Sequence, residues 1–221
     1  MARPYDVITF DCYGTMIDWE GGISDAFLAA AAADGRTLDR TRILQAYAAI
    51  EPVVEARGYR PYRDVLAETA RQVAERLEWP LSPERARFLP DSLAAWPPFP
   101  DTNPALQRLA AAGYRLGILS NVDDDLLEAT RRHFTSHFDL IVTAQQVGSY
   151  KPAPAHFETA RRRLGDSRWL HAAQSYFHDV VPARALGIPV AWINRGREIA
   201  ADGRGADHEC YDLLALADWL C

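Results

Sequence analysis

Five short, nearly continuous apolar runs constrain the fold of this chain more than any other feature. They lie at residues 7–10, 116–119, 140–142, 170–173 and 190–193. Continuous apolar character is typical of strands that are covered on both faces, as in a parallel sheet. Helical patterns separate the later runs, at residues 103–112, 123–134, 154–164 and 181–186. This repeated strand–helix order predicts an α/β fold with a doubly wound, mainly parallel sheet.

The segment between the first and second runs has helical periodicity and no convincing strand. Its helical patterns cover residues 23–33, 41–56, 63–77 and 83–93. An ordinary crossover holds one helix and two short loops, so this segment is too long to be one. We therefore predict an α-helical cap at 18–96, inserted into a Rossmann-like core of residues 1–17 and 97–221. A proline-rich run at 96–100 is the expected stiff return to the core.

Charge and composition exclude several classes of partner. The net charge is −6 and the pI is near 5.5, so no global positive field exists to hold nucleic acid or anionic lipid. The apolar runs are shorter than the roughly 20 residues of a membrane helix, and no signal-peptide pattern opens the chain. Cys12, Cys210 and Cys221 cannot all pair and have no metal-ligand spacing. We expect a cytoplasmic protein whose partner is a small anionic substrate, with no nucleic acid and no membrane. The sequence leaves open whether the protein forms a homodimer.

Chemically active side chains follow four of the predicted strands, at the sheet edge where α/β proteins bind ligands. Asp11 follows the first strand, Ser120 and Asn121 the second, Lys151 the third and Asp179 the fourth. Lys151 is also the only lysine of the chain, which otherwise uses arginine for its cations. A compact ammonium fits a pocket that excludes a planar guanidinium. The combination predicts an anion-binding site that contains a nucleophile.

These residues carry a resemblance to a known family. The motifs Asp11-Cys12-Tyr13-Gly14-Thr15, Ser120-Asn121, Lys151-Pro152 and Asp179 resemble, in the same order, the four motifs of the haloacid dehalogenase superfamily. The resemblance covers essentially the whole chain, including a helical insertion after the first motif. It implies a Rossmann-like core, an aspartate nucleophile and a covalent aspartyl-ester intermediate. The tyrosine form of the first motif most resembles the type II L-2-haloacid dehalogenases.

Tyr13 supports that subdivision on chemical grounds. Phosphatases of the superfamily carry an acid two positions after the nucleophile, which protonates the departing alkoxide. A halide leaves as a stable anion and needs no proton, so tyrosine is acceptable there. We therefore predict hydrolytic dehalogenation of a small 2-haloalkanoic acid to a 2-hydroxy acid. Two alternatives stay open: a Mg²⁺-dependent small-molecule phosphatase that uses Asp11 and Asp179, and a non-catalytic anion-binding module.

The resemblance also implies a role for each site residue. Asp11 is the expected nucleophile, Lys151 keeps both carboxylates ionised, and Asp179 orients the hydrolytic water. The expected substrate-binding residues are Tyr13, Thr15, Ser120, Asn121 and Tyr176. A substrate carboxylate held by Lys151 needs no metal, so no cofactor is expected, and Mg²⁺ enters only with the phosphatase alternative. His171 and His178 are expected to be structural histidines.

The chain departs from the type II pattern in two places. In that family an arginine followed directly by a glutamine lies on the first part of the cap and helps to receive the halide, whereas Arg42 and Gln45 are not adjacent. In the fourth motif, Tyr176 and His178 stand where the family has asparagine and tryptophan. A basic-aromatic cluster in the cap lines the pocket or is solvated surface; it comprises Arg57, Tyr59, Arg60, Tyr62 and Arg63. These departures bear on the substrate and leave the nucleophile, lysine and aspartate intact.

Overall fold

A computed structural model describes residues 3–221 of the chain, and these residues form two compact units. One unit contains the chain up to Asp18, together with Pro98–Asn121 and Arg132–Cys221. The other contains Trp19–Pro97 and Val122–Arg131. We call them the sheet unit and the helical unit. No helix within residues 3–221 is both long enough and apolar enough to cross a bilayer.

The sheet unit is built on six parallel strands. They are β1 (Val7–Phe10), β2 (Arg115–Ser120), β3 (Leu140–Thr143), β4 (Trp169–Ala173), β5 (Val190–Ile193) and β6 (His208–Cys210). Their order is β3-β2-β1-β4-β5-β6, and every neighbouring pair is parallel. The predicted doubly wound sheet is confirmed. The sequence did not indicate β6, because this edge strand has only three residues and two of them are polar.

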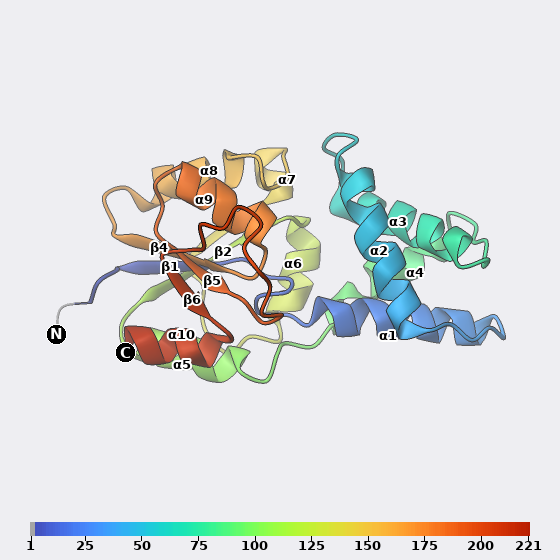
Figure 1. The fold of residues 1–221 in the computed structure, drawn as a ribbon, viewed down its shortest axis with the longest axis horizontal. Helices are drawn as coiled ribbons and strands as arrows, with labels where there is room; N and C mark the ends of the chain where they lie inside the picture. Colours follow the sequence, from blue (N-terminus) through green and yellow to red (C-terminus); the bar gives the residue numbers. More distant parts are fainter. Residues whose placement is uncertain (1–2) are drawn as a thin grey trace. The chain divides into compact units, whose positions relative to one another are not determined.

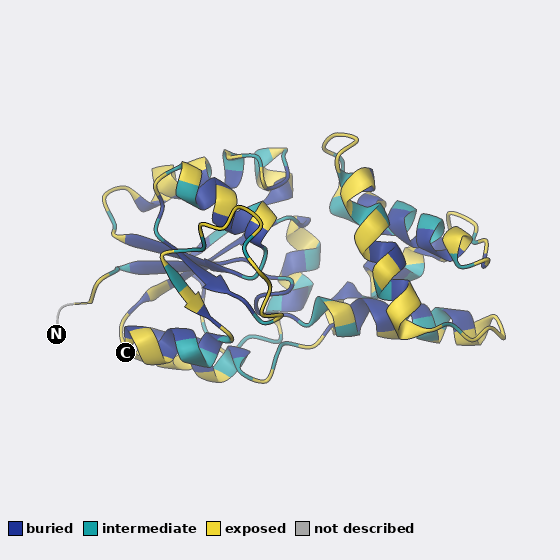
Figure 2. Ribbon diagram, viewed as in Figure 1, coloured by how far each residue is buried: buried dark blue, intermediate teal, exposed yellow. Residues whose placement is uncertain are grey.

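Helices cover both faces of this sheet, which explains why its central strands are mainly apolar. Figure 1 shows α5 (Thr102–Ala111) and α10 (Leu213–Leu220) on one side, and α8 (Ala155–Leu164) and α9 (Val181–Ala185) on the other. Every residue of β1, β4 and β5 is buried (Figure 2). Because no strand face meets water, polar side chains inside these strands need a specific partner.

The helical unit contains no strand among its described residues. Its elements are α1 (Trp19–Ala33), α2 (Arg40–Glu55), α3 (Tyr62–Arg76), η1 (Arg85–Arg87), α4 (Phe88–Ser92), η2 (Leu93–Ala95) and α6 (Asp124–Arg131). The helix predicted at residues 83–93 is thus divided into three short segments. That this unit serves as a cap stays a prediction.

Helix α6 belongs to the helical unit, although the predicted core range of 97–221 includes it. Asp123, just before α6, accepts hydrogen bonds from the backbone nitrogens of Tyr62 (2.7 Å) and Arg63 (3.1 Å). The Arg63 side chain donates to it as well, at 3.1 Å from Nε. Pro61 gives α3 no side-chain cap, so Asp123 caps this helix from a distant part of the sequence. Hydrogen bonds between residues so far apart in the sequence leave no local sequence pattern by which to predict them.

Candidate active site

Lys151 joins the two predicted catalytic carboxylates. Its Nζ lies 2.9 Å from Asp11 Oδ1 and 2.6 Å from Asp179 Oδ1. The same nitrogen donates to the Leu119 carbonyl oxygen at 2.9 Å. An ammonium has three donors, and these contacts use all of them. Lys151 therefore holds the two carboxylates together, and the expectation that it also holds a substrate carboxylate stays a prediction. We call Asp11, Lys151 and Asp179 the charged trio.

The sheet topology brings the charged trio together. Asp11 directly follows β1, the strand that lies between β2 and β4. Asp179 lies on η3 (Tyr176–Val180), a π-helical segment that begins just after β4. The hydroxyl of Ser175 caps this segment by accepting the N–H of His178 at 3.2 Å. Lys151 follows α7 (Ala144–Val147), which ends at Gly148 with a φ of 62°, a left-handed conformation that favours glycine.

Asn121 positions Lys151 through the backbone of that residue. Its Oδ1 accepts the Lys151 N–H at 2.7 Å, and its Nδ2 donates to the Lys151 carbonyl oxygen at 3.0 Å. The side-chain amide is thus used on both its donor and its acceptor side. The amide fixes the loop that carries the lysine, and the predicted substrate contact of Asn121 stays a prediction.

Thr15 orients Asp11. Its hydroxyl donates to Asp11 Oδ2 at 3.0 Å and accepts the backbone N–H of Gln174 at 2.9 Å. Thr15 is fully buried, whereas Asp11 keeps 7% of its surface exposed. Each oxygen of Asp11 therefore carries a hydrogen bond from the protein, and its carboxylate is fixed in one orientation. The Thr15 hydroxyl positions the nucleophile, and the predicted substrate contact at Thr15 stays a prediction.

The structure places Tyr176 in the core of the sheet unit. Its hydroxyl donates to the Asp202 carboxylate and accepts from Arg184 Nη1 at 3.2 Å. Its ring packs edge-on against Trp192, with 4.9 Å between the ring centroids. Packing turns the side chain toward β5 and the loop at residues 202–205, and the predicted substrate contact of Tyr176 stays a prediction.

Two buried oxygen atoms at the site have no hydrogen-bond partner within residues 3–221. They are Ser120 Oγ and Asp179 Oδ2. Buried polar atoms in native proteins are nearly always paired with protein or water, so these two mark places for a ligand or a water molecule. Tyr13, two residues after Asp11, is half-buried. The predicted roles of Ser120 and Tyr13 stay predictions.

Burial and charge act on the trio in opposite directions. Burial raises the pKa of Asp11, and the charge of Asp179 adds to this rise against the attraction of Lys151. Burial alone would also raise the pKa of Asp179, but Lys151 and a hydrogen bond from His171 outweigh it and lower that pKa to about 2. Burial would lower the pKa of Lys151, yet the two carboxylates raise it. The ammonium and the Asp179 carboxylate are therefore both charged at neutral pH.

The donor set does not fit a resident Mg²⁺ ion. Mg²⁺ requires octahedral oxygen ligation. Three of the four carboxylate oxygens of Asp11 and Asp179 already accept a hydrogen bond from Lys151 or Thr15. Residues 3–221 contain no cluster of three His, Cys, Asp or Glu side chains that could hold a metal ion. No step of the chemistry below passes through a metal.

His171 contacts the trio, which the sequence analysis missed. This buried residue of β4 places its Nε2 2.9 Å from Asp179 Oδ1. Its cross-strand neighbour on β1 is Thr9. The available signal was a pair of polar residues inside two otherwise apolar strands. Only the strand register shows that the pair meets.

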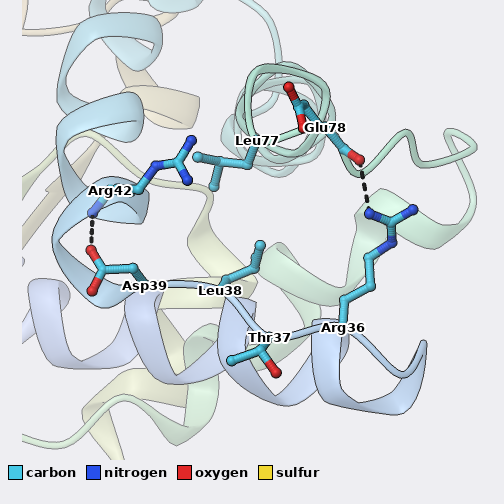
Figure 3. Close-up of a pocket in the computed structure, with 7 residues that line it drawn as sticks. All are labelled: Arg36, Thr37, Leu38, Asp39, Arg42, Leu77 and Glu78. Atoms are coloured by element: carbon cyan, nitrogen blue, oxygen red, sulfur yellow. Dashed lines mark hydrogen bonds between the residues drawn. The ribbon is translucent and has the colours of Figure 1, made fainter.

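The helical unit has a surface hollow of its own, shown in Figure 3. Its volume is about 570 Å³, and its lining consists of residues 36–39, Arg42, Leu77 and Glu78. Arg36 Nη1 closes one side by donating to the Glu78 carbonyl oxygen at 2.9 Å. Of the basic-aromatic cluster, Arg63 is paired with Asp123 and Asp125 inside the same unit. The hollow contains no member of the charged trio.

Comparison with known proteins decides the family. A family model for haloacid dehalogenase-like hydrolases matches residues 5–176. The chain belongs to this family. One relative of this haloacid dehalogenase-like hydrolase is (S)-2-haloacid dehalogenase H-109 of Pseudomonas putida. The two are 26% identical over 99% of each chain.

Solved structures of L-2-haloacid dehalogenases share the fold of this chain. The L-2-haloacid dehalogenase RSc1362 superposes with a TM-score of 0.85 at 23% identity, over 98% of both chains. The L-2-haloacid dehalogenase of Xanthobacter autotrophicus, solved with chloropropionic acid covalently bound, gives a TM-score of 0.81 at 21% identity over 97% of both chains. The similarity therefore extends over both units of the chain.

Proposed function

We propose that this hydrolase cleaves the carbon–halogen bond of a small 2-haloalkanoic acid and releases a 2-hydroxy acid and a halide ion. The observation that carries the proposal is the pairing of a firmly oriented Asp11, which keeps a small exposed surface, with Tyr13 at the position where a phosphatase has its acid. Two further facts support it: a relative is an (S)-2-haloacid dehalogenase, and a structural relative holds chloropropionic acid covalently.

The first step is nucleophilic substitution by Asp11. A carboxylate oxygen attacks C2 of the substrate, the carbon–halogen bond breaks, and the halide leaves with the electron pair. The product is an ester between the Asp11 carboxylate and C2 of the substrate, which keeps its own carboxylate. Lys151 and Thr15 hold the Asp11 carboxylate in one orientation, so the carboxylate loses little further freedom when the transition state forms. We propose that Ser120 Oγ, buried and unpaired among the described residues, receives the substrate carboxylate.

The second step is ester hydrolysis. Water adds to the carbonyl carbon of the Asp11 ester, the alkyl–oxygen group leaves as the hydroxyl of the product, and Asp11 is regenerated. We assign the orientation of this water to Asp179, whose Oδ2 is buried and has no partner in residues 3–221. Neither step requires a metal or an organic cofactor. The unpaired Cys12, Cys210 and Cys221 fit a reducing compartment, and we propose the cytoplasm.

The test is a release assay with 2-chloropropionate and a panel of phosphate monoesters, each with and without EDTA. We expect halide release that EDTA does not reduce, and no phosphate release. Asp11→Asn should lower kcat by several orders of magnitude and leave the unfolding temperature nearly unchanged, because it removes the nucleophile at constant volume. Phosphate release that depends on Mg²⁺ would establish the phosphatase alternative instead.

A single turnover in water labelled with heavy oxygen tests the intermediate directly. With enzyme in excess, hydrolysis at the ester carbonyl puts the label into Asp11 and not into the product. Mass spectrometry of the peptide that contains Asp11 measures this. Label found only in the product would mean that water attacks C2 directly, which would refute the covalent route.

A further inference from the structure

A continuous chain of hydrogen bonds runs behind Asp179, on the side away from Lys151. Trp169 Nε1 donates to Thr9 Oγ1 at 2.6 Å, and Thr9 Oγ1 lies 2.8 Å from His171 Nδ1. His171 Nε2 in turn lies 2.9 Å from Asp179 Oδ1. Every member of the chain is buried, and Thr9 and His171 have no exposed surface. None of these residues except Asp179 belongs to the motifs discussed above.

The partners in this chain determine which ring nitrogen of His171 carries the hydrogen. An indole nitrogen only donates, so Trp169 cannot accept the hydroxyl hydrogen of Thr9. Within residues 3–221 the Thr9 hydroxyl has no other acceptor than His171 Nδ1, so we assign its hydrogen to that contact, with Nδ1 as the acceptor. Nε2 then carries the hydrogen and donates it to Asp179 Oδ1. Two neighbouring strands fix this tautomer, because Thr9 and His171 are register partners of β1 and β4.

The ring of His171 is also fixed in orientation. Phe157 packs against it edge-on, with 5.2 Å between centroids and an interplanar angle of 89°. Asp179 Oδ1 thus receives two donors, His171 Nε2 and Lys151 Nζ, from different directions. With Oδ1 held twice, the carboxylate cannot rotate, and Oδ2 stays unpaired among the described residues.

We propose that His171 is a positioning residue for the hydrolytic half of the reaction. It holds Asp179 so that Oδ2 faces the water that attacks the Asp11 ester, and Thr9 sets the tautomer that makes this possible. His171 touches neither Asp11 nor the substrate in this role. The inference rests on the proposed function, because it assumes the two steps described above. It predicts that loss of His171 slows ester hydrolysis more than ester formation.

The main experiment compares His171→Phe with the wild type on 2-chloropropionate. Phenylalanine keeps the ring and its contact with Phe157 but removes both nitrogens. The lost hydrogen bond is one to a charged group, and such bonds are stronger than neutral ones. Its loss should lower kcat about tenfold to a hundredfold, with KM little changed. The alkylated form of Asp11, measured by intact-protein mass spectrometry during turnover, should accumulate. A purely structural role would lower the active fraction and leave the adduct fraction of active enzyme unchanged, which would overturn the proposal.

Two variants and a control sharpen this result. His171→Gln keeps a donor that can reach Asp179, and it should recover part of the lost kcat and reduce the adduct. Thr9→Val removes the hydroxyl that donates to His171 Nδ1, and with it the preference for hydrogen on Nε2. It should produce the same adduct at a lower level. His208→Phe is the control, since His208 stacks on Trp219 at 3.8 Å and contacts none of these residues. It should have wild-type kinetics and no adduct.

Nitrogen NMR of labelled histidine tests the tautomer without any substrate. We expect the wild-type His171 to carry hydrogen on Nε2 with Nδ1 as an acceptor, and this preference should weaken in Thr9→Val. Hydrogen on Nδ1 in the wild type would overturn the proposal whatever the enzyme's substrate is. If the tautomer is as expected but neither wild type nor variant forms an adduct with 2-chloropropionate, the proposed function has failed instead.

Discussion

Lys151→Arg is the most informative substitution, because it keeps the charge and changes only the shape. Lys151 is 1% exposed, and its single nitrogen contacts three oxygens at 2.6 to 2.9 Å. A guanidinium is larger and planar, and it would pair with one carboxylate through two parallel bonds and displace the other. The bonds from Asn121 to the Lys151 backbone prevent the loop from withdrawing to make room.

The expected magnitudes follow from this geometry. Moving the nucleophile by about 1 Å can cost roughly a hundredfold in rate, so we expect kcat to fall at least that far. Extra atoms in a filled site should cost about 1–3 kcal/mol of unfolding free energy. Lys151→Met is the matched variant, since it keeps the bulk and removes the charge. It removes the cation that the two buried carboxylates share, and we expect a loss of about 3–5 kcal/mol.

The assay is halide release for kcat and urea unfolding for stability, on the wild type and both variants. An account based on charge alone predicts that arginine restores activity and methionine does not. A kcat of Lys151→Arg close to that of the wild type would refute our reasoning. The single lysine of this chain would then be an accident of composition.

Three further predictions concern the helical unit. Asp123→Ala should lower the free energy of unfolding by about 1–3 kcal/mol, because it uncaps α3 and removes the acceptor of the Tyr62 and Arg63 backbone N–H groups. Asp125→Ala, at a mostly exposed position, should change this free energy little in the same urea titration. Gly22→Ala should cost about 1–3 kcal/mol as well, since its Cβ would lie 2.2 Å from Trp96 Cγ; unchanged stability would show that the indole can move. Burial raises the pKa of Glu51 to about 7, whereas its pKa in the unfolded chain is about 4.3, so the stability of the folded state falls as the pH rises between these two values. Glu51→Gln should therefore unfold at a higher temperature than the wild type at pH 8, and this gain should vanish near pH 4. A variant that is less stable than the wild type at pH 8 would contradict this sign.

Local sequence patterns were sufficient for the sheet and for the identity of the charged trio. The five apolar runs predicted five of the six strands to within one residue at each end, because continuous burial leaves a continuous apolar signature. Asp11, Lys151 and Asp179 could be assigned because each follows a strand, and parallel strands bring their carboxyl ends to one edge. The edge strand β6 was not predicted, because it pairs only with β5 and has no continuous apolar run.

Only the tertiary structure decided what the other polar side chains do. The sequence indicates the chemistry of Asn121 and Thr15, and only the structure shows that their side chains hold Lys151, Asp11 and Gln174. His171 has an ordinary sequence context, and its contact with Asp179 depends on the register between β1 and β4. The physical reason is directional: a sequence pattern places a backbone on a strand or turn, whereas a hydrogen bond depends on which atoms the packed side chains finally face.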